Sequence, residues 1–272
     1  MPPTTTATWG ADPLSSTVPP TTTATWGADP YAEALRRGRG PLFLRRTDGW
    51  LLPLEVERWC AGADAADRSA LGRCEGTVLD IGCGPGRLVA ALAAQGRRAL
   101  GIDISPAAVA RTTAAGGAAL PRSVFDSLPN EGSWGTALLL DGNIGIGGDP
   151  HALLVRTAEL IDRAGLLIVE TDPTDIDERC QVRLDTGRRA GRQLSGHPGA
   201  PLRHGGHPRP DDLFPWARVG TPALLRYAAA TGFSPAEQWT VAGPVDQSPG
   251  GAERCFVSLR RRPTPSLPAP RG

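Results

Sequence analysis

The sequence contains no lysine, so all 29 of its basic residues are arginines, and 28 acidic residues leave a net charge of +1. A charge so close to zero creates no overall field that would draw the protein onto nucleic acid or an anionic membrane. Apolar runs of the ~20 residues that span a bilayer are also missing. So is a basic segment followed by an apolar stretch at the N-terminus, the pattern of a secretory signal. We therefore expect a cytoplasmic protein without a nucleic-acid or membrane partner.

Cysteine and histidine are scarce. The five cysteines are scattered and never form a Cys-x-x-Cys pair, which argues against a disulfide framework or a zinc knuckle and favours a reducing compartment. His204 and His207 have the spacing of metal ligands, but Gly205-Gly206 predicts a loop there, and no cysteine or carboxylate completes a ligand set. We predict no metal site.

The two ends of the chain lack the apolar content of a folded core. Residues 2–13 recur letter for letter as residues 19–30, and both copies are rich in threonine and proline. We predict a disordered, duplicated tail over residues 1–30 and a second disordered tail over the proline-rich residues 263–272. One folded domain is then expected over residues 31–262.

Within that domain, apolar runs alternate with helical patterns. Nearly continuous apolar runs are typical of parallel strands that are covered on both faces. Seven segments are predicted as strands: 77–81, 99–102, 118–124, 136–140, 166–170, 237–241 and 254–259. The order of strands and helices predicts an α/β fold. We expect a Rossmann-like doubly wound sheet, mostly parallel with an antiparallel last strand, and helices on both faces.

Proline and glycine mark the ends of the predicted helices. Three helices are expected to begin where an N-cap residue precedes proline, at Ser105-Pro106, Asp149-Pro150 and Thr221-Pro222. Gly165 and Gly232 stand where helices commonly end.

Two segments lie outside this alternation. Residues 31–75 contain predicted short helices at 53–60 and 63–71 and a strand or extended arm at 42–46, and residues 172–215 form a long polar stretch. A long insert in a compact domain is commonly a functional lid or disordered. Its position after the fifth strand is near the carboxyl ends of the strands, where ligands bind. We expect the arm and the insert to form a lid.

A glycine-rich turn joins the first core strand to the helix predicted over residues 87–94. Its glycines, in Asp80-x-Gly82-x-Gly84-x-Gly86, permit a sharp turn and a close approach of backbone to a nucleotide. The dinucleotide fingerprint would require a further glycine where Arg87 stands, so that fingerprint fails by one residue. The Asp80 carboxylate also suits a ligand with an ammonium group better than a pyrophosphate. An NAD-dependent oxidoreductase remains an alternative that both features argue against.

Residues 78–86, Val-Leu-Asp-Ile-Gly-Cys-Gly-Pro-Gly, resemble motif I of the class I S-adenosylmethionine-dependent methyltransferases, in the methyltransferase type 11/25 style. The resemblance covers residues 76–170 and implies S-adenosylmethionine as the cofactor. It implies that Asp103, about 20 residues after the glycine turn, binds the ribose hydroxyls. The cofactor-binding set that the resemblance implies is Asp80, Gly82, Cys83, Gly84, Gly86, Asp103, Ile104, Phe125, Asp126, Ser127 and Asp141.

Two later segments resemble further parts of the family's site. Residues 123–129 resemble its adenine clamp, which implies that Asp126 accepts from the exocyclic amine and that Phe125 or Leu128 lies against the ring. Residues 140–148 correspond to the family's loop between the methionine end of the cofactor and the substrate. Asp141 or Asn143 could position the methyl acceptor there, or the loop could be a simple glycine linker.

The catalytic residue is left open. Methyl transfer attacks an already activated sulfonium carbon, so a base is needed only if the acceptor must lose a proton first. Candidates are Asp141, Asn143 and the insert histidines His197, His204 and His207. Trp216 could line the substrate pocket or anchor the core.

The expected function is methyl transfer to a small molecule, in bacterial secondary metabolism, with the oligomeric state left open. The near-neutral charge and the lack of an Asn-Pro-Pro-Tyr motif support a small acceptor. A non-catalytic S-adenosylmethionine-binding sensor or assembly protein is the second alternative beside the oxidoreductase.

Overall fold

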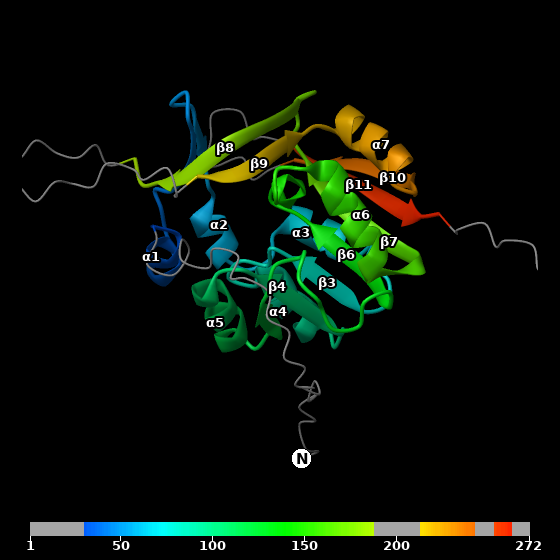
Figure 1. Cartoon of the computed structure of the whole chain (residues 1–272). Helices are drawn as coiled ribbons and strands as arrows, with labels where there is room; N and C mark the ends of the chain where they lie inside the picture. The colour runs from blue at the N-terminus through cyan, green and yellow to red at the C-terminus, as the bar shows by residue number, and fades with distance from the viewer. Residues whose placement is uncertain (1–29, 188–212, 243–252, 263–272) are drawn as a thin grey trace, which may run out of the picture.

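The computed structural model describes residues 30–187, 213–242 and 253–262, and these residues form two sheets (Figure 1). The tails predicted at the two chain ends, apart from Pro30, and the three insert histidines lie outside the described residues. Pro30 begins a helix, α1 (Pro30–Arg37), that the sequence pattern did not indicate. No helix of the described ranges is long and apolar enough to cross a membrane.

The larger sheet has seven strands in the order β10-β11-β7-β6-β3-β4-β5. Its strands are β3 (Val78–Ile81), β4 (Ala99–Asp103), β5 (Ala119–Pro121), β6 (Trp134–Leu139), β7 (Ile161–Thr171), β10 (Phe233–Val241) and β11 (Arg254–Arg261). The strands from β7 to β5 are parallel, whereas β11 runs antiparallel to both of its neighbours. The predicted fold class, a mostly parallel sheet with an antiparallel last strand, is confirmed.

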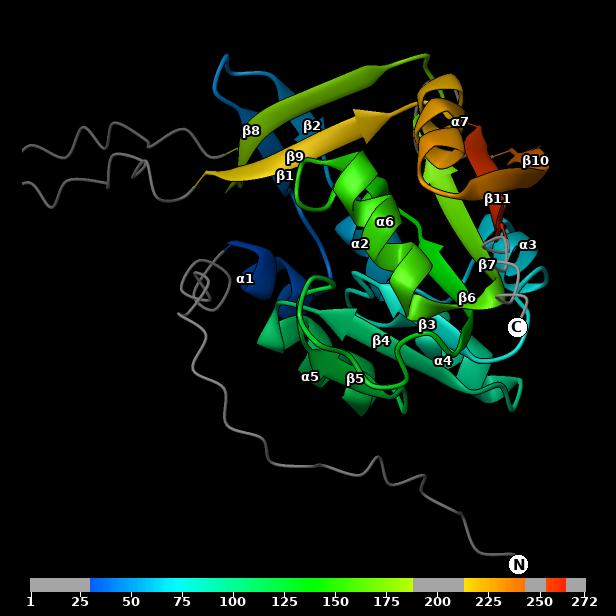
Figure 2. The same cartoon turned by 45° about the vertical axis from the view of Figure 1, so that its right-hand side comes forward.

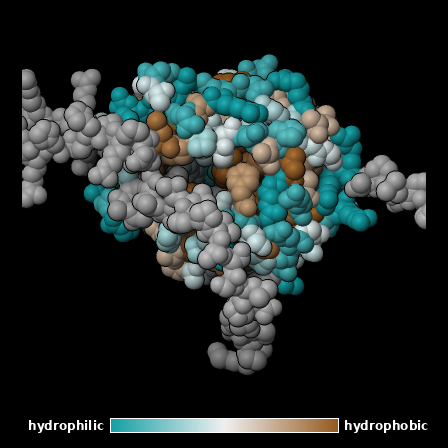
Figure 3. Space-filling view, in the orientation of Figure 1, coloured by the Kyte–Doolittle hydropathy of each residue, from teal (hydrophilic) through white to brown (hydrophobic). Residues whose placement is uncertain are grey.

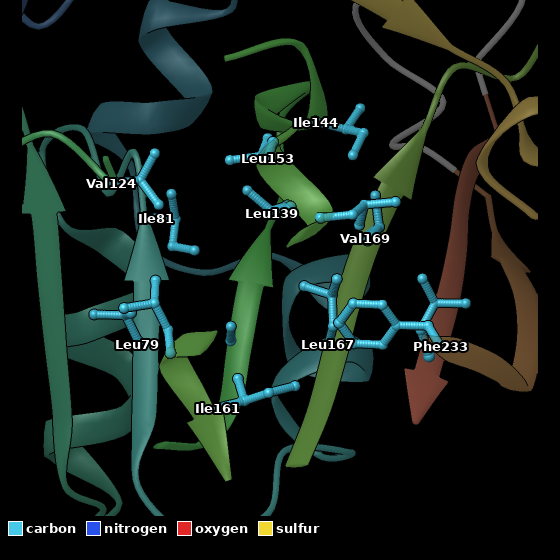
Figure 4. Packing of buried hydrophobic residues seen from close by; sticks show 14 of the residues in the cluster. Leu79, Ile81, Val124, Leu139, Ile144, Leu153, Ile161, Leu167, Val169 and Phe233 are labelled. Atoms are coloured by element: carbon cyan, nitrogen blue, oxygen red, sulfur yellow. The ribbon is translucent and has the colours of Figure 1, made fainter. Parts of the chain in front are cut away.

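Alternate side chains of the parallel strands are buried on opposite faces of this sheet. Leu79 of β3, Leu139 of β6 and Val169 of β7 belong to a cluster with α6 (Pro150–Leu160) and α7 (Thr221–Ala230) (Figure 4). The side chains between them pack against α3 and α4 on the other face. These helices are α3 (Ala65–Leu71) and α4 (Arg87–Ala94). Burial on both faces explains why the strands were recognisable as continuous apolar runs.

Most predicted helix ends are where the sequence placed them. Ser105 caps α5 (Pro106–Ala114) by accepting from Ala108 N, and Asp149 caps α6 by accepting from His151 N and Ala152 N. Gly232 follows α7 with a φ of 84°, as a C-terminal glycine should.

Two predicted helix ends are wrong. The N-cap of α7 is Gly220 rather than Thr221, because the Thr221 hydroxyl hydrogen-bonds the Thr171 hydroxyl at 2.8 Å and gives no cap. Gly165 does not end α6, because the chain passes directly from Leu160 into β7. Gly165 lies inside that strand, where a Cβ would meet the Ile161 side chain at 2.7 Å.

Several predicted segments have different lengths. The strand predicted over 118–124 stops at Pro121, and the chain then turns toward the site. The strand predicted from 237 begins at Phe233, with a bulge between Pro235 and Glu237. The helix predicted over 53–60 is only α2 (Val56–Cys60), because residues 51–53 pair as a strand.

The N-terminal arm and the polar insert meet in a second, antiparallel sheet of order β2-β1-β8-β9. Its strands are β1 (Phe43–Arg46), β2 (Leu51–Pro53), β8 (Asp177–Asp185) and β9 (Phe214–Val219). Figure 2 shows this small sheet beyond one end of the large one, with α1 and α2 between them. Only Cys180, Val182 and Leu184 among the residues of β8 are apolar, so the sequence shows no apolar run that would predict this strand. On the face seen in Figure 3, hydrophilic residues dominate the outer surface.

The packing of α6 predicts opposite outcomes for two neighbouring substitutions. Leu153 is fully buried against the large sheet, whereas Val155, on the same helix, is 40% exposed. Leu153→Ala should lower the free energy of unfolding by about 2–5 kcal/mol, the sum of lost burial and a residual cavity. Val155→Ala should change it by less than about 0.5 kcal/mol. Urea denaturation checks both, and equal effects would contradict this placement of α6.

Candidate functional site

A cavity of about 380 Å³ lies between the carboxyl ends of β3, β4 and β6 and the small sheet. This is a volume typical of small-molecule sites. The lining residues are Tyr31, Leu44, Leu54, Trp59, Ile81, Gly82, Cys83, Gly84, Pro85, Arg87, Ile102, Asp103, Ile104, Arg122, Ser123, Val124, Phe125, Asp141, Asn143, Ile146, Gly147, Leu184, Phe214, Pro215 and Trp216. The cavity thus joins the glycine turn to the arm and to the strands β8 and β9.

The glycine turn forms one wall, and its glycines are required by close contacts. Gly82, Gly84 and Gly86 have φ values of 73°, 55° and 86°, which side chains rarely adopt. A Cβ at Gly82 would lie 2.7 Å from Asn143 Nδ2, and one at Gly86 would lie 2.4 Å from Thr112 Cγ2. Gly82 and Gly84 line the cavity, whereas Gly86 is occupied with packing against α5.

Asp103 ends β4 with its carboxylate at the cavity. Its Oδ2 accepts from Gly84 N at 2.9 Å and its Oδ1 from Ser105 N at 2.8 Å. The Asp103 carboxylate therefore lies where the glycine turn, the start of α5 and the cavity meet. Next to it in the chain, Ile104 is an exposed apolar residue (40%) that also lines the cavity.

The segment after β5 places its residues differently from the implied clamp. Phe125 lines the cavity and is 47% exposed, whereas Leu128 is buried in the main core, so Phe125 is the residue available to a ring. Asp126 is exposed and accepts from Ser123 N at 2.9 Å, which closes its own turn. Neither Asp126 nor Ser127 lines the cavity; backbone and side chains of residues 123–125 do.

Asp80 lies beneath the turn rather than in the cavity lining. It is 1% exposed, and its Oδ2 has no hydrogen-bond partner among the residues that the structure describes. Burial raises the pKa of Asp80 to about 7, against the lowering effect of the Arg87 charge. Near neutral pH this carboxyl is therefore divided between its neutral and charged forms.

Arg87, which opens α4, binds two carboxylates at once. Its Nε and Nη2 donate to Asp67 at 2.8 and 2.9 Å, and its Nη1 and Nη2 donate to Asp141 at 2.6 and 3.0 Å. Asp67 is completely buried, and the Arg87 residue is 7% exposed. Paired guanidinium–carboxylate bonds of this geometry are the strong ones.

Arg87 is part of a larger set that we call the charged cluster: Arg58, Asp64, Asp67, Arg87, Asp141, Glu170 and Arg254. Arg254 binds both oxygens of Glu170 at 2.7 Å and reaches Asp67 at 3.0 Å. Arg58 Nη2 reaches Asp141 at 2.8 Å. Three guanidiniums thus face four carboxylates, so the cluster carries an excess of negative charge beside the cavity.

Asp141 is held rather than free. Its residue has a φ of 58°, its backbone N donates to Glu170 at 2.8 Å, and its carboxylate binds Arg87 and Arg58. Burial alone would raise the pKa of Asp141, but the charges of Arg87 and Arg58 outweigh burial and hold that pKa well below its usual range. Asp141 lines the cavity as a permanently charged, fully paired group and is unsuited to act as a base.

Asn143 and Trp216 both reach the cavity. The Asn143 amide donates to Ile81 O at 2.9 Å and Gly82 O at 3.0 Å, so it holds the glycine turn in place. Trp216 lines the cavity while its ring packs on Gly145, where a Cβ would lie 2.7 Å from the ring. The two roles considered for Trp216, pocket wall and anchor, therefore coincide.

The charged cluster was not predicted, and although the arm was expected to form part of a lid, its residues Tyr31 and Trp59 were not among the site candidates. In the sequence, Arg87 stood out only because the dinucleotide fingerprint requires a glycine at its position. An arginine in the first turn of a helix opposes the helix dipole, and this is the one local sign that a buried carboxylate lies nearby. Tyr31 and Trp59 carry no such sign, because their approach to the cavity depends on the packing of α1 and α2.

Comparison with known proteins bears on this site. Residues 78–126 match the model of a family described as a methyltransferase domain. None of the curated proteins matches the chain.

Solved structures share the fold. A S-adenosylmethionine-dependent methyltransferase from Bacteroides fragilis, in complex with S-adenosyl-L-homocysteine, is 20% identical, with a TM-score of 0.62 over 90% of this chain and 98% of that one. A S-adenosylmethionine-dependent methyltransferase from Methanosarcina mazei is 13% identical, with a TM-score of 0.52 over 75% and 100%. A structure from echinomycin biosynthesis is 18% identical, with a TM-score of 0.52 over 86% and 91%. The resemblance inferred from motif I is confirmed: the chain has the fold of these methyltransferases and carries their domain signature over residues 78–126.

The double ion pair predicts a large cost for removing its cation. Arg87→Leu should lower the free energy of unfolding by about 3–5 kcal/mol, because Asp67 would stay buried and lose its closest partner. The matched control is Arg163→Leu, at an exposed position of β7, with an expected change below about 0.5 kcal/mol. Denaturation in urea at pH 7 measures both, and a near-neutral Arg87→Leu variant would contradict the buried pairing.

The raised pKa of Asp80 predicts a pH-dependent effect of substitution. Between the ordinary pKa of an aspartate, 3.8, and the pKa of about 7 in the folded chain, the unfolded chain releases a proton that the folded chain retains. The stability that this group contributes is therefore fully present below pH 3.8 and lost as the pH rises to 7. Asp80→Asn cannot ionise, so its stability relative to the parent should rise by roughly 3 kcal/mol between pH 5 and pH 8. A pH-independent difference in urea unfolding would show that Asp80 is charged throughout this range.

Proposed function

We propose that this chain is a S-adenosylmethionine-dependent methyltransferase that acts on a small molecule. The observation that carries the proposal is the Asp103 carboxylate. It is hydrogen-bonded to the motif I turn at 2.9 Å, and it faces the same cavity that the small sheet closes on the far side. One cavity therefore extends from a nucleoside site to the small sheet, the side from which we propose that the acceptor approaches.

The residues present fit this cofactor. The carboxylate of Asp103 lines the cavity and is of the kind that accepts from ribose hydroxyls, and the exposed faces of Ile104 and Phe125 suit an adenine ring. The excess negative charge of the charged cluster, together with Asp80, favours a ligand with sulfonium and ammonium charges. Arg58 Nη1 is buried without a hydrogen-bond partner among the described residues, but Arg58 does not line the cavity.

When bound, S-adenosylmethionine supplies a methyl carbon activated by a sulfonium. The chain's own contribution is then to position and to exclude water. The glycine turn, Asp103 and Asn143 fix one wall of the cavity, and β1, β8 and β9 form the other. Holding two reactants in attack geometry can by itself supply about 7–11 kcal/mol of the barrier reduction. We propose that the arm, residues 31–75, and the insert, residues 172–215, together serve as the cover of this site.

We further propose that the acceptor belongs to bacterial secondary metabolism. The structure from echinomycin biosynthesis supports this only through its fold. The NAD-dependent alternative is disfavoured because the position of the missing glycine is filled by a guanidinium bound to two carboxylates. A non-catalytic S-adenosylmethionine-binding protein is separated from an enzyme by the transfer experiment below.

Asp103→Ala should weaken binding of S-adenosylhomocysteine roughly 10-fold to 100-fold, about 1–3 kcal/mol, because buried hydroxyls would lose their acceptor. Asp175→Ala removes an exposed carboxylate outside the cavity lining and should leave the affinity unchanged. Calorimetric titration measures both. Unchanged affinity in the Asp103 variant would refute the ribose assignment, and binding of NAD alone would refute the proposed function.

Activity is tested by incubating the protein with methyl-labelled S-adenosylmethionine and a bacterial metabolite extract. Label should appear in a small-molecule product with the parent chain and drop sharply with Asp103→Ala at low cofactor concentration. Tight cofactor binding with persistent absence of transfer would instead identify a sensor or assembly protein.

A further inference from the structure

Aromatic side chains are concentrated around the cavity. They make up only 5% of the chain, yet five of them line this one site: Tyr31, Trp59, Phe125, Phe214 and Trp216. Four form two edge-to-face pairs. Tyr31 and Trp59, from α1 and α2, have ring centroids 6.4 Å apart at 72°, and Phe214 and Trp216, from β9, have centroids 6.4 Å apart at 87°. Two separate parts of the chain therefore present aromatic surface to the same space.

The wall opposite the glycine turn carries no charge among the described lining residues. Leu44 of β1, Leu184 of β8 and the β9 residues 214–216 are all uncharged. The remaining space on this side is closed by Leu54 and Trp59. A charged group placed against this wall would lose its hydration without gaining a partner, which is costly.

The charged residues that line the cavity are elsewhere and have partners. Arg87 and Asp141 bind each other, and Asp103 accepts from two backbone N–H groups. Arg122 is exposed at the end of β5 and donates to Pro121 O. All four follow the strands of the large sheet or open α4, on the side that we assign to the cofactor. The two halves of the cavity thus differ in chemistry.

We infer that the methyl acceptor is an uncharged, flat aromatic or heteroaromatic molecule, held against Trp216 and Phe214. This inference rests on the proposed function and adds the substrate class to it. Flat rings gain most from surfaces of this kind, because aromatic contacts favour offset and edge-to-face arrangements at the spacing seen here. Trp216 is then a specificity-determining residue of the acceptor half.

The same wall constrains the reaction. The attacking atom that suits this apolar wall is one with a lone pair in the neutral molecule, such as a ring nitrogen or an aromatic amine, because no proton has to be removed before it attacks. That lone pair forms the bond to the methyl carbon while the methyl–sulfur bond breaks and its electron pair stays on sulfur. The positive charge passes from sulfur to the acceptor, which releases a proton to water where it carries one.

Three matched probes test the substrate class: indole, indole-3-acetate and tryptamine. Each is titrated into the complex of the parent protein with S-adenosylhomocysteine, with binding followed by calorimetry or ligand-observed NMR. Neutral indole should bind at least tenfold more tightly than either the anion or the cation. Indole-3-acetate and tryptamine carry CH₂ groups that indole lacks, and the additional apolar surface by itself favours their binding. Tighter binding of indole would therefore be due to its lack of charge.

Variants assign the binding to the aromatic wall. Trp216→Ala should weaken indole binding at least tenfold and leave the affinity for S-adenosylhomocysteine unchanged, which also reports that the variant is folded. Trp50→Ala is the matched control, because Trp50 is 38% exposed beside the β1–β2 hairpin and does not line the cavity. Phe214→Leu, a smaller change, serves if Trp216→Ala does not fold, and should weaken indole binding several-fold.

Equal or tighter binding of a charged probe, absence of binding by all three probes, or unaltered indole affinity in the Trp216 and Phe214 variants would overturn the inference. Failure of the parent chain to bind S-adenosylhomocysteine would refute the proposed function instead, so the two failures are distinguishable.

Discussion

The buried guanidinium of Arg87 is the interaction on which the arrangement of the site depends. It joins Asp67 of α3 to Asp141 at the end of β6, and Arg254 continues the contact to Glu170 of β7. Some of these partners are nearly 190 residues apart in the sequence. A buried ion pair is weak evidence for stability, because desolvation offsets much of the attraction. The ion pairs of Arg87 instead fix the relative positions of these elements, because each charge has its partner only when the turn, the arm and the sheet are in their native places.

Two properties of the cavity follow from this arrangement. Asp141 is held in a left-handed conformation with its backbone and carboxylate both bonded, and this directs the next residues so that Asn143 reaches the glycine turn. The excess of carboxylates keeps this side of the cavity electronegative, which suits a cationic methyl donor. The opposite wall belongs to the small sheet and is apolar. A polar half built on the large sheet thus faces an apolar half built from the arm and the strands β8 and β9.

The sequence predicted the parts of the fold that local patterns determine. Strands covered on both faces appear as apolar runs, and caps such as Ser105 and Asp149 need only neighbouring residues. The glycine turn and Asp103 were recognisable for the same reason. The charged cluster was not, because its partners lie far apart in the chain. β8 was not, because only Cys180, Val182 and Leu184 alternate with polar residues there, and this short strand pattern lies within a long polar segment. The Asp126 assignment assumed that the carboxylate faces the ligand, whereas the structure places it in its own turn. The sequence therefore predicted residues that would contact the methyl donor, whereas for the acceptor it offered only candidates such as Asn143 and Trp216.

The central claim is that the cavity at the carboxyl ends of β3 and β4 binds S-adenosylmethionine through Asp103. A crystal structure of the chain with S-adenosylhomocysteine tests it most directly. The account predicts both ribose hydroxyls on the Asp103 carboxylate, the adenine against Ile104 and Phe125, and the ion pairs of Arg87 with Asp67 and Asp141 unchanged. The nucleoside bound elsewhere, or ribose hydroxyls without a hydrogen bond to the Asp103 carboxylate, would contradict it.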